Sequence, residues 1–513
     1  MSHAIVLATL NARFTHASLG LRYLRANLGE LREVCVLREL VLGVAPETAV
    51  AEWLAGSPRL IGLSVAIWNV APLTRIVELI KAAAPDVVVV LGGPEVSHEV
   101  ADQRICALAD YVVTGWGEVT FARLARAILE GERPTVKVHH GERPPLATLI
   151  FPYDEFSDDD LGRRRLYVEA SRGCPFRCEF CLSALERTAW PFPLQPLLVE
   201  LGRLYDRGAR RFTFVDRTFN LRIDTAVAIL GFFLERLRAR PDDPLFLHFE
   251  LIPDHLPDRL KGLLADFPPG SLQLELGVQT FNPQVQALIS RRQDNARTET
   301  NLRWLCGHTA AHLHADLIVG LPGEDFASFA AGFDRLVQLG PHEIQVGLLK
   351  RLRGAPIGRH TERFGLEFCP DPPYAVLATD RIDRPTMQRL ARFAHFWDRV
   401  GNSGRFSRTL PLLLGDAPCT RFLAWSDWMY SRLGKAHGIP LEALYDGLHD
   451  WLASQGVAAA VYEVLVADYV ATGARGRLSF APSLRPPLPI RQATGATPER
   501  QARHLKPRLP SSH

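Results

Sequence analysis

The chain has 513 residues, of which 47% are hydrophobic and 22% charged, with a formal net charge of +3. This balance is typical of ordinary globular proteins, and the length predicts two or three domains. Charges of both signs are interspersed, so the composition indicates no nucleic-acid partner. We see neither a secretory signal nor an apolar run long enough to span a membrane, so we expect a cytoplasmic protein without a membrane anchor.

Five short β-rich runs alternate with helical patterns over residues 1–150. The runs cover residues 4–8, 34–37, 60–66, 87–91 and 111–114. This alternation predicts a doubly wound parallel sheet of the Rossmann type, which binds its ligands at the carboxyl ends of the strands. Glycines follow two of the runs, in Gly92-Gly93-Pro94 and in Gly115-Trp116-Gly117. There they allow a bulky ligand to approach the backbone closely.

A stretch rich in Pro, Arg and Asp at 130–165 predicts a linker, and a second alternating series follows it. Its six strand candidates are 166–170, 211–215, 245–250, 272–276, 315–319 and 343–348. Six strands separated by helical patterns predict a partial (β/α)6 barrel of the TIM type over 160–370. Residues 371–475 predict a mostly helical region, and residues 476–513, dense in Pro, Arg and Ser, predict a disordered tail.

Three cysteines form the most specific pattern in the chain, Cys174-Pro-Phe-Arg-Cys178-Glu-Phe-Cys181. Three thiolates at this spacing hold one face of an iron–sulfur cluster and leave one iron open to a cofactor or substrate. The alternatives are structural cysteines or zinc, but zinc prefers four ligands and no fourth Cys or His lies nearby at a usual spacing. The other cysteines are scattered, so a second cluster would need three of them to meet in space. They are Cys35, Cys106, Cys306, Cys369 and Cys419.

The cysteine motif, preceded by Ser171-Arg172-Gly173 and carrying Phe180 before its last cysteine, resembles the signature of the radical S-adenosylmethionine (SAM) superfamily. The resemblance implies a 4Fe-4S cluster on Cys174, Cys178 and Cys181, whose open iron binds SAM. It further implies reductive cleavage of SAM to a deoxyadenosyl radical that abstracts hydrogen from a substrate. The electron would come from a reductant such as flavodoxin or ferredoxin.

Later strand ends also resemble segments of this superfamily, and the resemblance implies that they contact SAM. The residues implied are Phe180, Asp216, Glu250, Gln279, Ile318 and Gly320. One departure concerns the second strand, which lacks the Gly-Gly-Glu sequence that many members use for the methionine amino group. Asp216 or Thr218 would take that role here.

Residues 1–150 resemble the cobalamin-binding domain of one large subgroup, through Ser64-Val-Ala-Ile-Trp-Asn69, Leu91-Gly-Gly-Pro94 and Gly115-Trp-Gly-Glu118. The subgroup's Asp-x-His-x-x-Gly ligand motif is absent, and the first loop offers His16 at a different spacing. His16 is therefore either an axial cobalt ligand or a residue of the loop or domain junction. The cobalamin contacts implied are Asn11, Thr15, His16, Ser64, Gly92, Gly93, Gly115, Gly117 and Glu118.

The resemblance to a bacterial branch of this subgroup with a helical C-terminal region implies cobalamin-dependent methyl transfer, to a substrate that the sequence does not identify. Two alternatives remain. One is radical rearrangement, cyclisation or C–C cleavage without methyl transfer, and the other is a non-enzymatic protein that binds an iron–sulfur cluster and a corrinoid. The related methylthiotransferases carry extra N-terminal cysteines, whereas only two cysteines precede residue 174 here. Lys350 and Arg351 either meet an acidic substrate group or pair with acids such as Glu343.

Overall fold

The computed structural model describes residues 3–456, 458–485 and 496–505. The chain forms two compact units. The first contains Met1–Asp216 with two later segments, Lys350–Gly358 and Cys369–Ala375, and the second contains Arg217–Leu349, Arg359–Phe368 and Val376–His513. The fold belongs to the α/β class that the sequence predicts, with parallel sheets in both units and a helical region near the C-terminus.

An N-terminal parallel sheet of six strands forms the centre of the first unit, in the order β2-β1-β3-β4-β5-β6. Its strands are β1 (Ile5–Asn11), β2 (Cys35–Val41), β3 (Leu60–Ser64), β4 (Val88–Gly92), β5 (Tyr111–Thr114) and β6 (Val138–His140). The order reverses on either side of β1, as in a doubly wound fold, so the predicted Rossmann-type sheet is confirmed. The edge strand β6 lies in the stretch that we expected to be a linker, and its three residues are too few and too polar to signal a strand.

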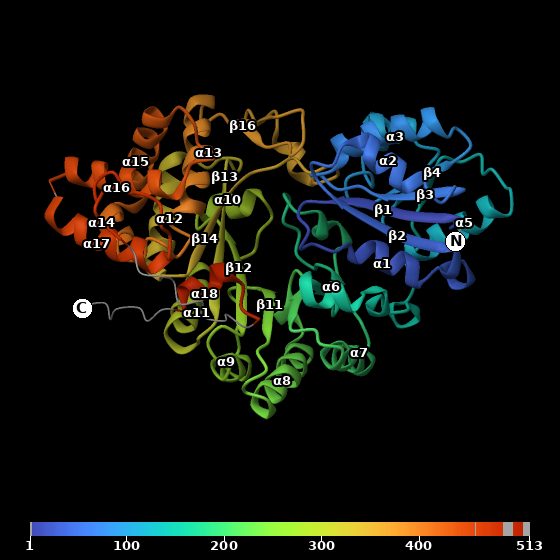
Figure 1. Ribbon diagram of the computed structural model, residues 1–513, viewed down its shortest axis with the longest axis horizontal. Helices are drawn as coiled ribbons and strands as arrows, with labels where there is room; N and C mark the ends of the chain where they lie inside the picture. The colour runs from blue at the N-terminus through green and yellow to red at the C-terminus, as the bar shows by residue number, and fades with distance from the viewer. Residues whose placement is uncertain (1–2, 457, 486–495, 506–513) are drawn as a thin grey trace. The chain divides into compact units, whose positions relative to one another are not determined.

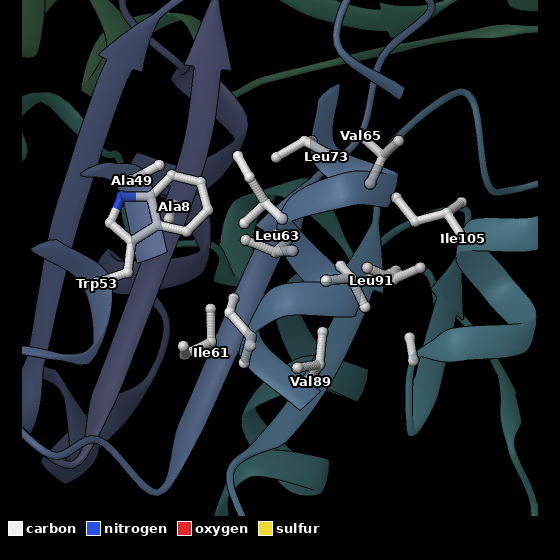
Figure 2. Close-up of a cluster of buried hydrophobic side chains, with 14 of the residues drawn as sticks. Ala8, Ala49, Trp53, Ile61, Leu63, Val65, Leu73, Val89, Leu91 and Ile105 are labelled. Atoms are coloured by element: carbon white, nitrogen blue, oxygen red, sulfur yellow. The ribbon is translucent and has the colours of Figure 1, made fainter. Parts of the chain in front are cut away.

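Helices cover both faces of this sheet (Figure 1). They are α1 (Leu19–Ala26), α2 (Pro46–Leu54), α3 (Val70–Ala83), α4 (Arg104–Leu108) and α5 (Glu118–Leu129). Successive strand residues face opposite sides of the sheet, so residues three positions apart lie on different faces. Leu63 packs with α2, α3 and α4, whereas Leu60 packs with α1 and α5. Figure 2 shows the first of these cores, with Trp53 of α2 beside Ala8 of β1.

A hairpin that the sequence did not predict carries the cysteine motif. After α6 (Asp158–Arg163) and β7 (Leu166–Val168), strands β8 (Ser171–Gly173) and β9 (Ala189–Pro191) pair antiparallel. Residues 174–188, including the 3-10 helix η5 (Leu182–Glu186), connect the two arms. The chain continues through α7 (Leu194–Asp206) into β10 (Arg211–Phe214), which pairs parallel with β7.

The second unit continues the alternation with four parallel strands, paired in the order β11-β12-β13-β14. The strands are β11 (Phe246–Leu251), β12 (Leu272–Gln279), β13 (His312–Val319) and β14 (Glu343–Leu348). Helix α8 (Ile223–Ala239) precedes β11, and the helices between the four strands are α9 (Asp258–Ala265), α10 (Pro283–Leu288), α11 (Asn295–His308) and α12 (Phe326–Leu339). With β7 and β10, these strands supply the six β/α repeats expected of a partial barrel.

The C-terminal region is helical, as predicted. It contains α13 (Arg384–Arg399), α14 (Leu410–Leu414), α15 (Pro418–Leu433), α16 (Leu441–Ser454) and α17 (Ala458–Thr472). Trp397 joins it to the barrel part of the second unit, because its ring lies 4.7 Å from that of Phe333 in α12 and its Nε1 donates to Ile344 O at 2.8 Å. Among the described residues, no helix is both long and apolar enough to cross a membrane.

A short helix, α18 (Glu499–His504), lies within the stretch that we expected to be disordered. Arg500 forms an ion pair with Glu343 at 2.7 Å, and Gln501 donates to Gln273 Oε1 at 3.0 Å. These contacts place α18 against the starts of β12 and β14. Residues 486–495 and 506–513 of the expected tail lie outside the described residues.

Candidate functional site

A cavity of about 480 Å³ opens in the first unit at the carboxyl ends of β3, β4 and β5. Its lining combines the N-terminal sheet, helices α1 and α5, and the cysteine-bearing hairpin. Residues from the sheet and its helices include Gly20, Tyr23, Ser64, Gly92, Gly93, His98, Gly115, Gly117 and Glu118. The hairpin and the strand before it contribute Glu169, Arg172, Gly173, Leu182 and Glu186.

Glycines shape this cavity for a broad ligand. A Cβ added to Gly20 or Gly115 would meet no protein atom within 4 Å, so it would occupy space that the cavity leaves open. Gly93 has a different role, because its φ of +108° and the Val65 carbonyl oxygen, 2.5 Å from an added Cβ, exclude any side chain. The lining therefore fits the flat corrin ring of cobalamin, which needs backbone at close range.

Most of the residues expected to contact cobalamin line the cavity, but the first loop does not. Ser64, Gly92, Gly93, Gly115, Gly117 and Glu118 are all part of the lining. Asn11 instead donates its Nδ2 to Glu39 Oε1 at 3.1 Å, and the Thr15 carbonyl accepts from the Arg165 amide at 2.8 Å. The loop after β1 thus contacts the segment that leads into β7.

His16 lies in this same loop and contacts β7. Its Nδ1 is 2.5 Å from the hydroxyl of Tyr167, and the two rings stack with their centroids 6.1 Å apart. Burial lowers the pKa of His16, and the nearby Arg165 and Arg13 add to this effect. These contacts place His16 against the strand β7 in the first unit. The histidine that lines the cavity is His98, which follows the Gly92-Gly93-Pro94 turn and which sequence reasoning missed.

The three motif cysteines lie on the connection between β8 and β9. Cys174 and Cys178 are each 8% exposed, Cys181 is half-buried, and the Cys181 amide donates to Cys178 O at 3.0 Å. Gly173 must be glycine, because its φ is +86° and an added Cβ would lie 2.3 Å from Thr188 O. A short loop bearing three sulfur donors fits an iron–sulfur cluster.

The scattered cysteines have different surroundings. Cys35 and Cys106 belong to the hydrophobic clusters on opposite faces of the N-terminal sheet. Burial raises the pKa of Cys35 to about 12 and that of Cys106 to about 11, which disfavours the thiolate that a metal requires. Cys306 donates its thiol to Leu339 O at 3.3 Å. The settings of these three cysteines are typical of packing residues.

Asp216, expected to approach SAM, hydrogen-bonds to the start of the hairpin. The carboxylate is 3% exposed and accepts from the Ala170 amide at 2.8 Å and from Ser171 Oγ at 2.5 Å. Burial raises its pKa to about 7, against the effect of these hydrogen bonds. Phe180 lies half-buried on the loop, between Cys178 and Cys181. Both residues belong to the first unit.

The other residues expected to contact SAM lie at strand ends of the second unit. Glu250 near the end of β11 pairs with Arg217 at 2.9 Å, and burial raises its pKa. Gln279 ends β12 after a register shift and has a φ of +69°, a strained value for a residue with a side chain. Ile318 lies near the end of β13, and Gly320 follows it with a φ of +85° and Val376 2.6 Å from an added Cβ.

One face of β11–β14 carries ionisable groups instead of aliphatic side chains. Glu250 lies beside Glu275 in the register, and His314 follows on β13 next to Glu275. His248 Nε2 is 3.1 Å from Glu275 Oε2. Burial, with Glu275 and Glu250 nearby, raises the pKa of Asp316 well above its ordinary value. These ionisable groups lie side by side on β11, β12 and β13 and give the middle of this face donors and acceptors of hydrogen bonds.

At the opposite, amino ends of β13 and β14, His312, Glu343 and His504 offer ligand atoms within 4.8 Å of one another. Glu343 already pairs with Arg500 at 2.7 Å and contacts His312 Nε2 at 2.9 Å. His504 Nε2 lies 3.1 Å from Asn402 O. We interpret this group as the hydrogen-bond network that docks α18.

The basic segment after β14 pairs with acids of the first unit. Arg351 contacts Glu99 at 3.0 Å, and Arg353 contacts both Glu95 and Glu99 at 3.0 Å. Lys350 forms a backbone bridge with Ala375. The pairing alternative therefore holds for Arg351, although its partner is Glu99 rather than Glu343.

Comparison with protein families finds matches in three successive parts of the chain. The B12 binding domain family matches residues 5–125, and the Radical SAM superfamily matches residues 168–336. Residues 362–481 match a further family described as a protein of unknown function, DUF4080.

Two curated relatives are similar over parts of their length. An uncharacterized methyltransferase of Pyrococcus horikoshii is 27% identical over 42% of this chain and 52% of its own. The cobalamin-dependent radical SAM methyltransferase TokK of Streptomyces tokunonensis is 25% identical over 82% of this chain and 65% of its own. The chain thus spans less than two thirds of either relative.

A solved structure shares the fold over most of the chain. It is the cobalamin-dependent SAM radical enzyme OxsB with aqua-cobalamin and SAM bound. The match has a TM-score of 0.62 at 15% identity and covers 91% of this chain and 78% of OxsB. At this identity the likeness supports the fold.

Proposed function

From the premise that the chain belongs to the radical SAM superfamily of enzymes, in the subgroup with a B12-binding domain, we propose that it is a cobalamin-dependent radical SAM methyltransferase. Its cofactors are a 4Fe-4S cluster, SAM and cobalamin. When bound, the cluster and SAM supply the radical that removes a hydrogen from the substrate, and cobalamin supplies the methyl group. We further propose that flavodoxin or ferredoxin delivers the electron.

The observation that carries the proposal is the shared wall of the cavity. One compact unit contains both the glycine-rich strand ends of the B12-binding domain and the hairpin with Cys174, Cys178 and Cys181. The hairpin residues Arg172, Gly173 and Leu182 flank the cysteines and line the same cavity. A corrin in this cavity would lie next to the loop that holds the cluster, as transfer of a methyl group to a nearby substrate radical requires.

In this proposal the residues of this chain bind the cofactors and orient them. Cys174, Cys178 and Cys181 hold the cluster, and Ser64, Gly92, Gly93, Gly115, Gly117 and Glu118 hold the corrin. The residues assigned to SAM in this proposal are Phe180 in the first unit and Glu250, Gln279, Ile318 and Gly320 in the second. Asp216 supports the cluster loop indirectly, through its hydrogen bonds to Ala170 and Ser171 at the start of the hairpin. Asn11, Thr15 and His16 support the junction with β7.

The test uses full-length protein purified without oxygen after supply of hydroxocobalamin, then incubated with dithionite and SAM labelled in its methyl group. About one corrinoid per chain is expected, with deoxyadenosine released and label recovered in the corrinoid. Deoxyadenosine without corrinoid label would favour rearrangement, cyclisation or C–C cleavage. Bound cofactors with neither product would favour a non-enzymatic binding protein.

A further inference from the structure

One short motif of the B12-binding domain contacts both arms of the cysteine hairpin. The motif is Gly115-Trp116-Gly117-Glu118, which joins β5 to α5. On the first arm, Arg172 Nη1 donates to Glu118 Oε1 at 2.6 Å. Next to the second arm, Trp116 Nε1 donates to Glu186 Oε1 at 2.8 Å, at the end of η5, and the Trp116 ring lies 5.9 Å from that of Trp190 in β9. The three cysteines lie between these two anchors, so the motif sets where the cluster loop begins and ends.

Arg172 makes the larger set of contacts. Its Nε and Nη2 contact Glu169 Oε1 at 2.9 and 2.8 Å, and its guanidinium lies 4.5 Å from the ring centroid of Tyr23 and 4.9 Å from that of Trp116. The side chains of Arg172, Glu118 and Glu169 are 16%, 7% and 8% exposed. A planar, delocalised cation suits this arrangement of two carboxylates and two aromatic rings, and lysine does not.

The same residues form part of the cavity wall. Tyr23, Trp116, Glu118, Glu169 and Arg172 all line the cavity. A ligand in the cavity therefore acts on the groups that hold the hairpin. In the other direction, a cluster that orders the cysteine loop also fixes the hairpin part of the wall.

We propose that Arg172 is a positioning residue that couples occupancy of the cavity to the cluster loop, so that cobalamin and the iron–sulfur cluster bind cooperatively. The inference rests on the proposed location of the two cofactors and is independent of methyl transfer. Coupling between two binding sites is reciprocal, so each cofactor raises the affinity for the other by the same factor. Couplings of this kind amount to roughly 5- to 150-fold.

The experiment measures the dissociation constant of hydroxocobalamin by absorption titration of the full chain with and without the cluster. The cluster-free form is the triple variant C174A/C178A/C181A. We expect the cluster-loaded wild type to bind at least about fivefold more tightly than the cluster-free form. In Arg172→Gln this ratio should fall to about one. Arg203→Gln is the matched control, because Arg203 pairs with Glu200 and Asp154 on the exposed side of α7 and lies outside the cavity lining.

A spectroscopic readout separates coupling from a merely structural role. Hydroxocobalamin should change the electron paramagnetic resonance spectrum of the reduced cluster in the wild type and in R203Q, but not in R172Q. If R172Q does not fold, R172K retains the charge without the planar fork, and its ratio should lie between those of R172Q and the wild type.

Equal affinities with and without the cluster in the wild type would overturn the inference, without recourse to any Arg172 variant. If R172Q showed the same ratio of affinities with and without the cluster as the wild type, the inference would also be overturned. Failure of the wild type to bind hydroxocobalamin at all would contradict the proposed function as well. Binding of hydroxocobalamin without any coupling to the cluster contradicts the inference and leaves the proposed function in place.

Discussion

The two groups of parallel strands bury their side chains in different ways. In the N-terminal sheet an apolar cluster packs against each face. Leu63 belongs to one cluster, and Leu60, three positions earlier in β3, belongs to the other. In β11–β14 one face is apolar, as at Leu274, while the other carries groups such as Glu275 and His314. The polar groups that line the cavity of the first unit lie at or beyond the carboxyl edge of the first sheet. The second group of strands carries polar groups on the strands themselves.

The largest expected effect concerns the cluster beside the first sheet. Cys178→Ala should abolish the brown absorbance of the cluster and all cleavage of SAM, because two thiolates do not secure a cluster with one open iron. Cys369→Ala is the control, since Cys369 is half-buried and outside the motif. Iron content and deoxyadenosine release measure the effect. A normal iron content in C178A would show that Cys178 is not a ligand.

Filling the cavity tests whether the edge of the first sheet binds the corrin. In Gly20→Trp the new ring should occupy the cavity and weaken hydroxocobalamin binding roughly 5- to 150-fold, since overpacking costs about 1–3 kcal/mol. Thermal unfolding should change little, because an added Cβ at Gly20 meets no protein atom. Gly231→Trp in α8 is the matched control, at another helical glycine with open space. Unchanged affinity in G20W would place the corrin elsewhere.

The next prediction concerns Glu324, in the turn after β13, which is one of the buried ionisable groups of the second unit. Burial raises its pKa to about 7, while Thr280 Oγ1 donates to it at 2.5 Å. A carboxyl with a raised pKa stabilises the folded state at low pH, and this stabilisation is lost as the pH rises from the ordinary value of 4.5 through 7.

Glu324→Gln should remove this pH dependence, because a carboxamide stays neutral. Urea unfolding at pH 5 and pH 8 measures the effect. Relative to the wild type, the free energy of unfolding of the variant should rise by up to roughly 3 kcal/mol between pH 5 and pH 8. Identical pH profiles for the two proteins would mean that Glu324 ionises normally.

The smallest expected effect concerns the loop after β1. His16→Ala should leave the absorption bands of bound corrinoid in place, since the His16 ring contacts Tyr167 and does not line the cavity. His98→Ala is the informative partner, because His98 is the histidine of the lining. A band shift in H16A alone would restore His16 as the cobalt ligand.

The strand ends of the cavity were predictable from sequence, whereas the loop contacts were not. Gly92 and Gly115 follow buried runs, and the strand pattern places them at one edge of the sheet. The position of His16 depends on pairing between distant residues, such as Glu39 with Arg22 and Arg164. No local pattern encodes those contacts.

The cysteine hairpin shows the same limit. Its arms have only three residues each, and Gly173, which ends the first arm opposite Ala189, has a φ of +86° that favours glycine. The sequence identified the cysteines by their spacing. Arg172 appeared only as a neighbour in the motif, because its partners Glu118 and Tyr23 lie 54 and 149 positions earlier in the chain.

The return of the chain to the first unit after β14 has a consequence for how such proteins diversify. Arg353 and Tyr374 both contact Glu95, at 3.0 and 2.6 Å, so residues encoded far downstream complete the surroundings of the loop that contains His98. The compact unit that contains the B12-binding domain is therefore not one continuous segment of the chain. A recombination event that exchanged residues 1–216 between relatives would separate Glu95 from the two later segments. Such an exchange would require matching changes at both, which favours inheritance of the whole chain over shuffling of its parts.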